Sequence, residues 1–219
     1  MVSEIITTYD AESPVTAIQM KRDDFYREQV DLSKKGKKPS KAVAVVNVLM
    51  FDTKGEIFIQ KRSSVKAHNP GLFDKSMGGH IRFGDTADYT VMVETIQELQ
   101  IPSIVLRNDQ DFIKTFDLLY EYLNSIAIVK HIDTKNLTLV KKIKSDDVPV
   151  INRFDLYFGV YNGSVKTVDR EAKGIILYTI DDLKESIEAA PTLFTNDLAM
   201  LISRYNQQIL EFIKLIKKK

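Results

Sequence analysis

The hydrophobic pattern predicts β-strands in the first half of the chain. Residues 42–51 form an almost unbroken apolar run rich in β-branched side chains, and residues 56–62 alternate between apolar and polar. Both patterns are typical of strands, and the intervening segment Asp-Thr-Lys-Gly, 52–55, is typical of a turn. We therefore expect the two runs to pair as a hairpin. A further short strand, interrupted by two glycines, is expected within residues 75–83.

Residues 86–100 follow the pattern of an amphipathic helix. Apolar side chains recur at helical spacing through this segment, which is long enough for about four turns. Asp85 or Thr86 is a suitable N-cap, and Pro102 follows the last apolar position. A helix is therefore expected here, directly after the glycine-containing strand.

The second half of the chain mixes helical and strand patterns. No regular alternation of strand and helix is present, which favours an α+β fold with a mixed sheet over a doubly wound one. The expected elements are a helix around 109–124, a β-region at 125–140, a polar connection at 141–147, strands at 154–161 and 174–180, and helices from Asp181 and from about Thr195 to the C-terminus.

Composition narrows the possible partners. The 31 basic and 30 acidic residues nearly cancel, so no overall field attracts DNA or a membrane surface. Cysteine is absent, so a bound metal would need oxygen or imidazole ligands, and a reducing compartment is expected. The first residues lack the features of a signal peptide, and the run 42–51 is about half the length of a membrane-spanning helix. We expect a soluble, cytoplasmic protein.

Two acidic side chains of the predicted helix carry the strongest chemical signal. Glu94 and Glu98 are four residues apart, so their carboxylates share one helix face. Such a pair is often a solvated surface. Two close carboxylates also suit a hard cation such as Mg²⁺, which takes oxygen ligands. The preceding glycines would allow the backbone to approach a metal or phosphate closely.

Residues 79–101, GHIRFGDTADYTVMVETIQELQI, resemble the Nudix box. That motif reads G, five residues, E, seven residues, then R-E-U-x-E-E-x-G-U, with U a bulky aliphatic residue. The matching positions are Gly79, Glu94, Glu98 and Ile101, with Asp85 in place of the first glutamate. The resemblance implies a Nudix-type α+β fold, a mixed sheet sandwiched between helices. It also implies Mg²⁺ or Mn²⁺ held by Glu94, Glu98, Gln97 and the backbone of Gly79.

The box departs from the motif at three positions. Val93 replaces the arginine, Gln97 replaces one glutamate, and Gln100 replaces the final glycine. The loss of one anionic ligand predicts weaker metal binding. In family members the arginine pairs with the first glutamate of the box, so the junction before the helix needs another source of stability here.

The context of the box resembles the branch of the superfamily that includes isopentenyl-diphosphate isomerase. In that branch Arg62 and Lys66 match positions that contact diphosphate, although basic loop residues are often merely exposed. His80 would contact phosphate or metal, or serve as a structural histidine. Glu171 matches a glutamate that ligates metal or activates water, but its neighbours suit a simple turn equally well.

The resemblance also divides the chain into regions. We expect an N-terminal extension over 1–40, a Nudix domain over 41–200 with an insertion near 105–150, and a C-terminal helix over 201–219 packed on the domain. The lysine-rich segment 34–39 suits a solvated loop better than a phosphate clamp. The apolar stripe of the last helix suits packing on the core better than a partner surface.

Two functional hypotheses follow. The first is a metal-dependent pyrophosphohydrolase that cleaves a nucleoside-diphosphate-linked or related diphosphate, with Glu94, Glu98 and Glu171 as catalytic residues and Arg62, Lys66 and His80 binding substrate. The second is a catalytically weak or inactive nucleotide-binding or regulatory domain. The comparison with the isopentenyl-diphosphate isomerase branch argues against isomerase activity, because Gly78 stands where the family places its catalytic cysteine and the chain has no cysteine. The expected partner is a small diphosphate or nucleotide, and the resemblance allows a homodimer.

Overall fold

The computed structural model describes residues 4–66, 68–143, 146–166 and 172–217. The strands are β1 Ile5–Asp10, β2 Ile18–Lys21, β3 Lys41–Phe51, β4 Ile57–Arg62, β5 Phe73–Asp74, β6 Met77–His80, β7 Ser103–Leu106, β8 Ala127–Ile143, β9 Asp146–Val160 and β10 Ala172–Tyr178. The helices are α1 Arg22–Lys34, α2 Ala87–Leu99, α3 Asp109–Leu119, α4 Ile180–Ala189, α5 Asn196–Arg204 and α6 Asn206–Ile216, with short 3-10 helices at Tyr120–Tyr122 and Pro191–Leu193.

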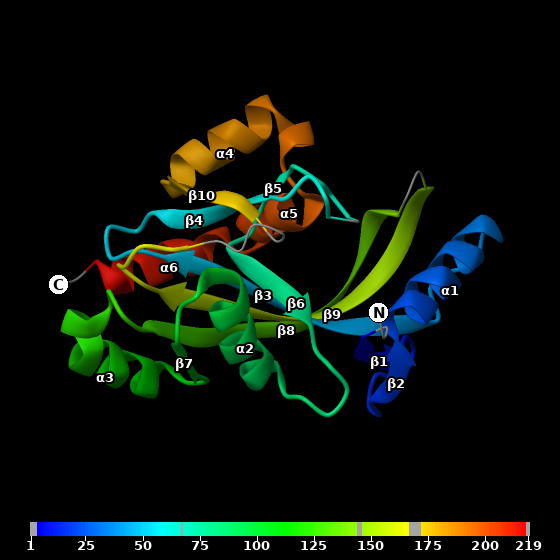
Figure 1. Ribbon diagram of the computed structural model, residues 1–219, viewed down its shortest axis with the longest axis horizontal. Coiled ribbons are helices and arrows are strands. Elements are labelled where there is room, and N and C mark those ends of the chain that lie inside the picture. The colour runs from blue at the N-terminus through cyan, green and yellow to red at the C-terminus, as the bar shows by residue number, and fades with distance from the viewer. Residues whose placement is uncertain (1–3, 67, 144–145, 167–171, 218–219) are drawn as a thin grey trace.

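The strands form one mixed sheet with helices on both sides (Figure 1). The main strand order is β10-β4-β3-β9-β8-β7. The β3–β9 and β7–β8 pairs are parallel, and the other neighbours in this order are antiparallel. The predicted hairpin of the first two runs is confirmed as β3 and β4, joined through a turn in which Gly55 has φ 82°.

The continuous apolar run of β3 is explained by burial on both faces of the sheet. Val43, Val45, Leu49 and Phe51 belong to the core beneath α5 and α6. The intervening residues pack with α2 on the other face, and these are Ala44, Val46, Val48 and Met50. A strand covered on both faces reads as a near-continuous apolar run rather than an alternating one. This central strand supports the short β6, which pairs with residues 45–48.

The hairpin of β8 and β9 is longer than the sequence pattern indicated. Residues 141–143 and 146–147, predicted as part of a polar connection, are strand residues, so that prediction was wrong. Lys142 lies opposite Asp147 in the register, and such opposite charges stabilise a solvated part of a ladder. The hairpin extends to one side of the molecule, where α1 lies against β9 (Figure 1).

The C-terminal helical pattern is divided between two helices. The single helix predicted from about Thr195 is interrupted at Tyr205, which separates α5 from α6. The apolar stripe packs on the chain's own core, as predicted. Its buried members include Ile209, Phe212 and Ile216.

The N-terminal region is integrated into the sheet. β1 pairs with both β2 and β3, and α1 begins directly after β2. The predicted loop at 34–39 begins at the end of α1, and Gly36 in it has φ 63°. In the described part of the chain, no helix is long and apolar enough to cross a membrane.

Candidate functional site

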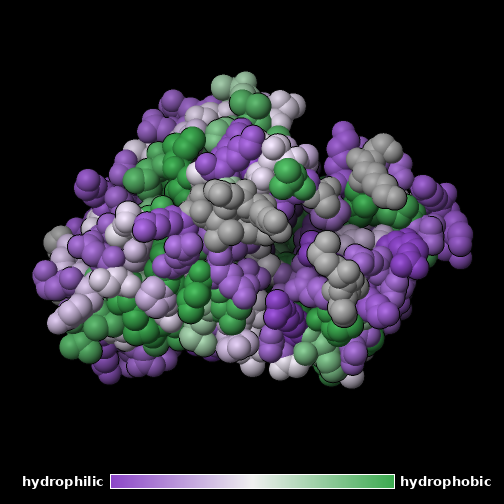
Figure 2. Space-filling view, in the orientation of Figure 1, coloured by the Kyte–Doolittle hydropathy of each residue, from purple (hydrophilic) through white to green (hydrophobic). Residues whose placement is uncertain are grey.

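A cavity of about 480 Å³ lies between α2 and β6 on one side and α1 and the β8–β9 hairpin on the other. Figure 2 shows a hollow near the middle of the face, bordered mainly by hydrophilic side chains. The structure brings seven residues of the predicted site into this cavity: Arg62, Lys66, Gly79, His80, Glu94, Gln97 and Glu98. Glu171 lies outside the described residues.

The start of α2 is fixed by the side chains of two residues. Thr86 is the N-cap, and its hydroxyl accepts a hydrogen bond from the backbone N–H of Tyr89. In the first turn, Asp88 accepts two hydrogen bonds from Arg107, at 2.6 and 2.9 Å, and one from Tyr157 at 2.8 Å. These contacts hold the junction between the loop and the helix. They provide the stability that the missing arginine of the motif would otherwise supply.

Gly79 lets the carboxylate of Glu94 lie against the backbone of β6. A Cβ atom at residue 79 would meet Glu94 Oε1 and lie 2.7 Å from Glu94 Cδ. Any larger residue at this position would therefore displace the carboxylate. The same argument applies less directly to Gly78, whose Cβ would lie 2.6 Å from Lys75 Cε and 2.9 Å from the carbonyl oxygen of Val46.

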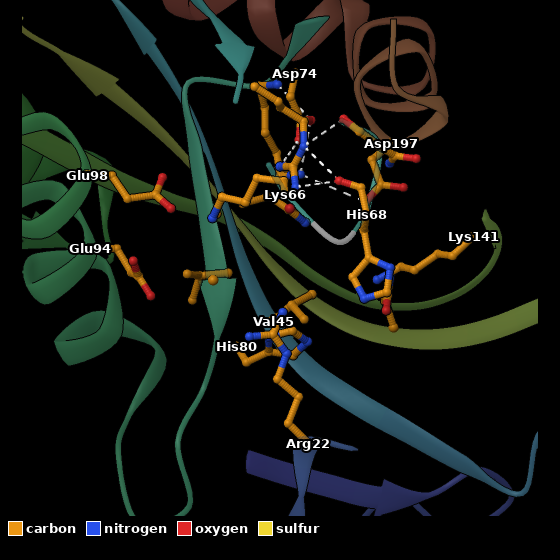
Figure 3. A pocket seen from close by; sticks show the side chains of 18 of the residues that line it. Arg22, Val45, Lys66, His68, Asp74, His80, Glu94, Glu98, Lys141 and Asp197 are labelled. Atoms are coloured by element: carbon orange, nitrogen blue, oxygen red, sulfur yellow. Dashed lines mark hydrogen bonds and ion pairs between the residues drawn. The ribbon is translucent and has the colours of Figure 1, made fainter. Parts of the chain in front are cut away.

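Glu94 and Glu98 face the cavity from consecutive turns of α2 (Figure 3). Burial and the neighbouring Glu94 raise the pKa of Glu98 to about 7, while Lys66 opposes the rise. Burial, followed by the charge of Glu4, also raises the pKa of Glu94. Two buried carboxylates with raised pKa values lack sufficient counter-charge, and a bound cation would supply it.

His80 is held by a side chain of the N-terminal region. Its Nε2 lies 2.9 Å from the hydroxyl of Tyr26, and the two rings meet edge to face. Burial and then the positive charges of Arg22 and Lys141 hold the pKa of His80 well below its usual value. The imidazole is therefore neutral at pH 7, and one of its ring nitrogens has a protein partner.

Arg62 has a clear structural task. Its Nη1 donates to Asp74 at 2.9 Å, Nη2 donates to the carbonyl of His68 at 2.9 Å, and Nε reaches the carbonyls of His68 and Asn69. The guanidinium thus fastens the loop that carries Lys66. Its direct contact with a diphosphate stays a prediction.

A buried carboxylate that the sequence did not single out organises this wall. Asp74 accepts hydrogen bonds from Arg62, from the hydroxyl of Thr195 at 2.8 Å and from the backbone and side chain of Lys75. Burial alone would raise the pKa of Asp74, but Lys75 and Arg62 outweigh it and lower the pKa below its ordinary value. Lys75 also lies 3.8 Å from Asp197 of α5, which ties the C-terminal helices to the cavity.

The opposite wall comes from regions in which sequence reasoning found no functional residue. Arg22 and Tyr26 come from α1, and Lys141 comes from β8. Both segments are far from the box in sequence, and no motif connects them to it. Their contribution to the site follows from the fold alone.

The donor set suits a divalent cation, though it is sparse. In the described ranges, no group of three His, Asp or Glu side chains stands ready to hold a metal. Glu94 and Glu98 provide carboxylate oxygens, Gln97 lines the same cavity with an amide, and the bare backbone at Gly79 lies against Glu94. Oxygen donors of this kind fit Mg²⁺ or Mn²⁺.

No protein-family model and no curated protein sequence matches this chain. Among solved structures it is similar to DR0079 from Deinococcus radiodurans, with a TM-score of 0.60 and 18% identity over 92% of this chain and 98% of that chain. Lower similarities include the MutT protein from Methanosarcina mazei Go1, with a TM-score of 0.47 and 16% identity over 81% and 96% of the two chains. A NUDIX-family hydrolase from Clostridium perfringens has a TM-score of 0.44 and 15% identity over 79% and 95%.

These similarities concern the fold alone, since every identity is below 20%. The chain agrees with DR0079 over nearly the full length of both proteins. The predicted fold class is confirmed: an α+β fold in which helices cover both faces of a mixed sheet.

Proposed function

We propose that this protein is a Nudix-type, metal-dependent pyrophosphohydrolase that cleaves a nucleoside-diphosphate-linked or related diphosphate. The observation that carries the proposal is the pair Glu94 and Glu98. Their carboxylates face one cavity from consecutive turns of α2, beside a glycine strand and opposite basic side chains. The similarity of this segment to the Nudix box, from Gly79 to Ile101, supports the same assignment.

The acidic residues would hold Mg²⁺ or Mn²⁺ through Glu94, Glu98, the amide of Gln97 and the backbone of Gly79. When bound, such an ion neutralises a diphosphate and makes a water easier to deprotonate. Glu94, whose carboxylate lies against β6, would orient that water. Glu171 is assigned the same supporting role on its resemblance alone.

The basic residues would bind the diphosphate. Lys66 acts on Glu98 more strongly than any other cation, which indicates that its ammonium lies near the metal ligands. Arg62 holds the loop of Lys66 and would offer its remaining N–H groups to a phosphate oxygen. His80, neutral at pH 7, would contribute a hydrogen bond rather than a charge.

A weak or inactive nucleotide-binding domain is the second candidate. Val93 and Gln97 favour it, because they remove an arginine and a glutamate from the box. In that case the cavity would bind metal and nucleotide without cleaving the phosphoanhydride bond. The cytoplasm remains the proposed location, and a small diphosphate or nucleotide remains the proposed partner.

A hydrolysis assay separates the two candidates. Purified protein is incubated with a panel of nucleoside-diphosphate derivatives, with Mg²⁺ or Mn²⁺ and after metal removal, and products are separated by chromatography. The hydrolase proposal expects metal-dependent product, with a loss of at least roughly tenfold in Glu98→Gln and in Glu94→Gln. Metal and nucleotide binding without product would instead support the binding domain.

Glu188→Gln is the matched control for these variants. Glu188 is an exposed residue of α4 and does not line the cavity. The same chemical change should leave hydrolysis at the parent level. If Glu98→Gln also retained parent activity, the assigned site would be wrong.

A further inference from the structure

The cavity has two walls of opposite character. Glu94 and Glu98 face it from α2, whereas His68 and Lys141 face it from the other side and Arg22 approaches from α1 (Figure 3). Its volume of about 480 Å³ is within the range of pockets that hold whole drug-sized ligands. A diphosphate bound beside the carboxylates would therefore leave room for further groups of the same ligand.

The second wall has surplus positive charge. Glu4 is shared between two arginines, with Arg22 Nη1 at 3.4 Å and Arg82 Nε at 3.5 Å from its two oxygens. One carboxylate cannot neutralise two guanidinium groups. Both distances are long for ion pairs, so the Arg22 guanidinium retains capacity for another anion.

Lys141 adds a second cation to this wall. Its ammonium lies 5.9 Å from the centre of the Tyr26 ring. Burial lowers the pKa of Lys141, but Tyr26 and Asp197 outweigh it and raise the pKa, so the side chain is charged. Within the described ranges, no carboxylate forms an ion pair with it. Its position follows from the alternation of β8, which turns Leu137, Leu139, Lys141 and Ile143 to the more buried side. An inward-facing ammonium that is kept charged and lacks a direct ion pair in the described ranges can accept a further anion from a ligand.

His68 shows the combined effect of these charges. Burial is the largest cause of its lowered pKa, and Lys141, Arg22 and Arg62 lower it further. Its ring lies 5.2 Å from that of Tyr26. Cations of α1, β4 and β8 therefore all lie close enough to His68 to act on its charge.

We propose that Arg22 and Lys141, together with His68, form a second phosphate subsite across the cavity from Glu94 and Glu98. The inference rests on the proposed hydrolysis of a diphosphate and specifies its substrate class: a diphosphate that carries a further phosphate group. Arg22 offers a guanidinium fork and Lys141 a point charge, a combination suited to a phosphate oxyanion. Neither residue belongs to the box or its flanking segments.

Inorganic phosphate tests the subsite separately from hydrolysis. Its binding is measured by calorimetry on the full chain, freed of metal on a chelating resin so that no soluble chelator competes. Without metal, the carboxylate wall repels phosphate, so binding reports the basic wall. We expect binding that weakens as salt increases. Arg22→Gln and Lys141→Gln should each weaken it roughly tenfold, the effect of losing one charged hydrogen bond.

Two variants serve as controls. Lys142→Gln removes the neighbouring, outward-facing charge of the same strand and should bind phosphate like the parent. Glu98→Gln removes a carboxylate of the other wall and should bind phosphate as well as or better than the parent. Thermal unfolding of each variant checks that the fold is retained, and Arg22→Lys should recover part of the binding if Arg22→Gln is unstable.

The outcomes separate this inference from the proposed function. The subsite is refuted if metal-free parent protein binds no phosphate, if both Arg22→Gln and Lys141→Gln bind like the parent, or if Mg²⁺ with pyrophosphate displaces the phosphate. Phosphate binding that depends on these residues upholds the subsite even if no diphosphate is hydrolysed. Diphosphate hydrolysis by a protein that binds no phosphate would support the proposed function and refute the subsite.

Discussion

At the scale of single residues, the site depends on the absence of a side chain at Gly79. The sequence placed this glycine at the start of the box but could not show its partner. The structure shows that the space of its missing Cβ is used by the carboxylate of Glu94. Since this carboxylate is the far end of a flexible side chain, it can move away when a methyl group is added, at little cost to the fold.

Gly79→Ala should therefore weaken metal binding while the protein stays folded. We expect Mn²⁺ affinity, measured by electron paramagnetic resonance, to fall at least roughly tenfold, as is usual when a metal ligand is misdirected. Gly174→Ala is the matched control, because a Cβ at residue 174 meets no atom within 4 Å. Unchanged Mn²⁺ affinity in Gly79→Ala would show that Glu94 does not bind the metal.

The raised pKa of Glu98 should make the metal-free protein less stable at high pH. The carboxyl has a folded pKa of about 7 against an ordinary value of 4.5, so the folded state binds the proton more tightly. Stability from this group is present below about pH 4.5 and is lost as pH rises through 7, with an upper limit of roughly 3 kcal/mol.

Urea unfolding of metal-free protein at about pH 5 and pH 8 measures this effect. Relative to the parent, Glu98→Gln should gain stability at the higher pH and much less at the lower one. Histidines and other carboxyls titrate in both proteins, so the difference between them isolates Glu98. A constant difference across the two pH values would mean that the Glu98 pKa is not raised.

At the scale of elements, α2 was predicted almost to its ends because every local signal agreed. Thr86 caps it, apolar residues follow its buried face, and it ends after Leu99. The structure also shows the effect of one departure from the motif. Gln100, which replaces the final glycine of the box, has φ 57°, a left-handed conformation that glycine adopts more easily.

Gln100→Gly should therefore stabilise the protein by roughly 0.5–1 kcal/mol, since it relieves a strained left-handed residue at a helix C-terminus. The free energy of unfolding in urea measures the change. Gln100→Ala keeps the Cβ atom and should show no such gain. Equal stability of the alanine and glycine variants would show that the helix end is not strained.

The β8–β9 hairpin shows where local signals were insufficient. Its outer part is half-solvated, so polar residues such as Lys142 and Asp147 resembled a connection. Lys142 and Asp147 are nevertheless strand residues, because they pair across the ladder of the hairpin. Pairing between polar residues leaves no periodic apolar signature in one sequence.

At the scale of the whole molecule, the cavity is assembled from several separate parts of the chain. Arg62, Lys66 and the residues from Gly79 to Glu98 could be predicted, because they belong to the box or to the segment that leads into it, whereas Asp74 carries no such signal. The contributions of Arg22 and Lys141 could not be predicted, because they depend on β1 joining β3 and on the long hairpin reaching α1. A single sequence carries no signal for contacts between elements that are distant along the chain.

Anomalous X-ray diffraction from crystals grown with Mn²⁺ and inorganic pyrophosphate would locate the metal relative to α2. We predict a manganese peak in contact with the carboxylates of both Glu94 and Glu98, with pyrophosphate density extending from it into the cavity. Manganese bound elsewhere, or absent from these carboxylates at full occupancy of the pyrophosphate, would contradict this prediction.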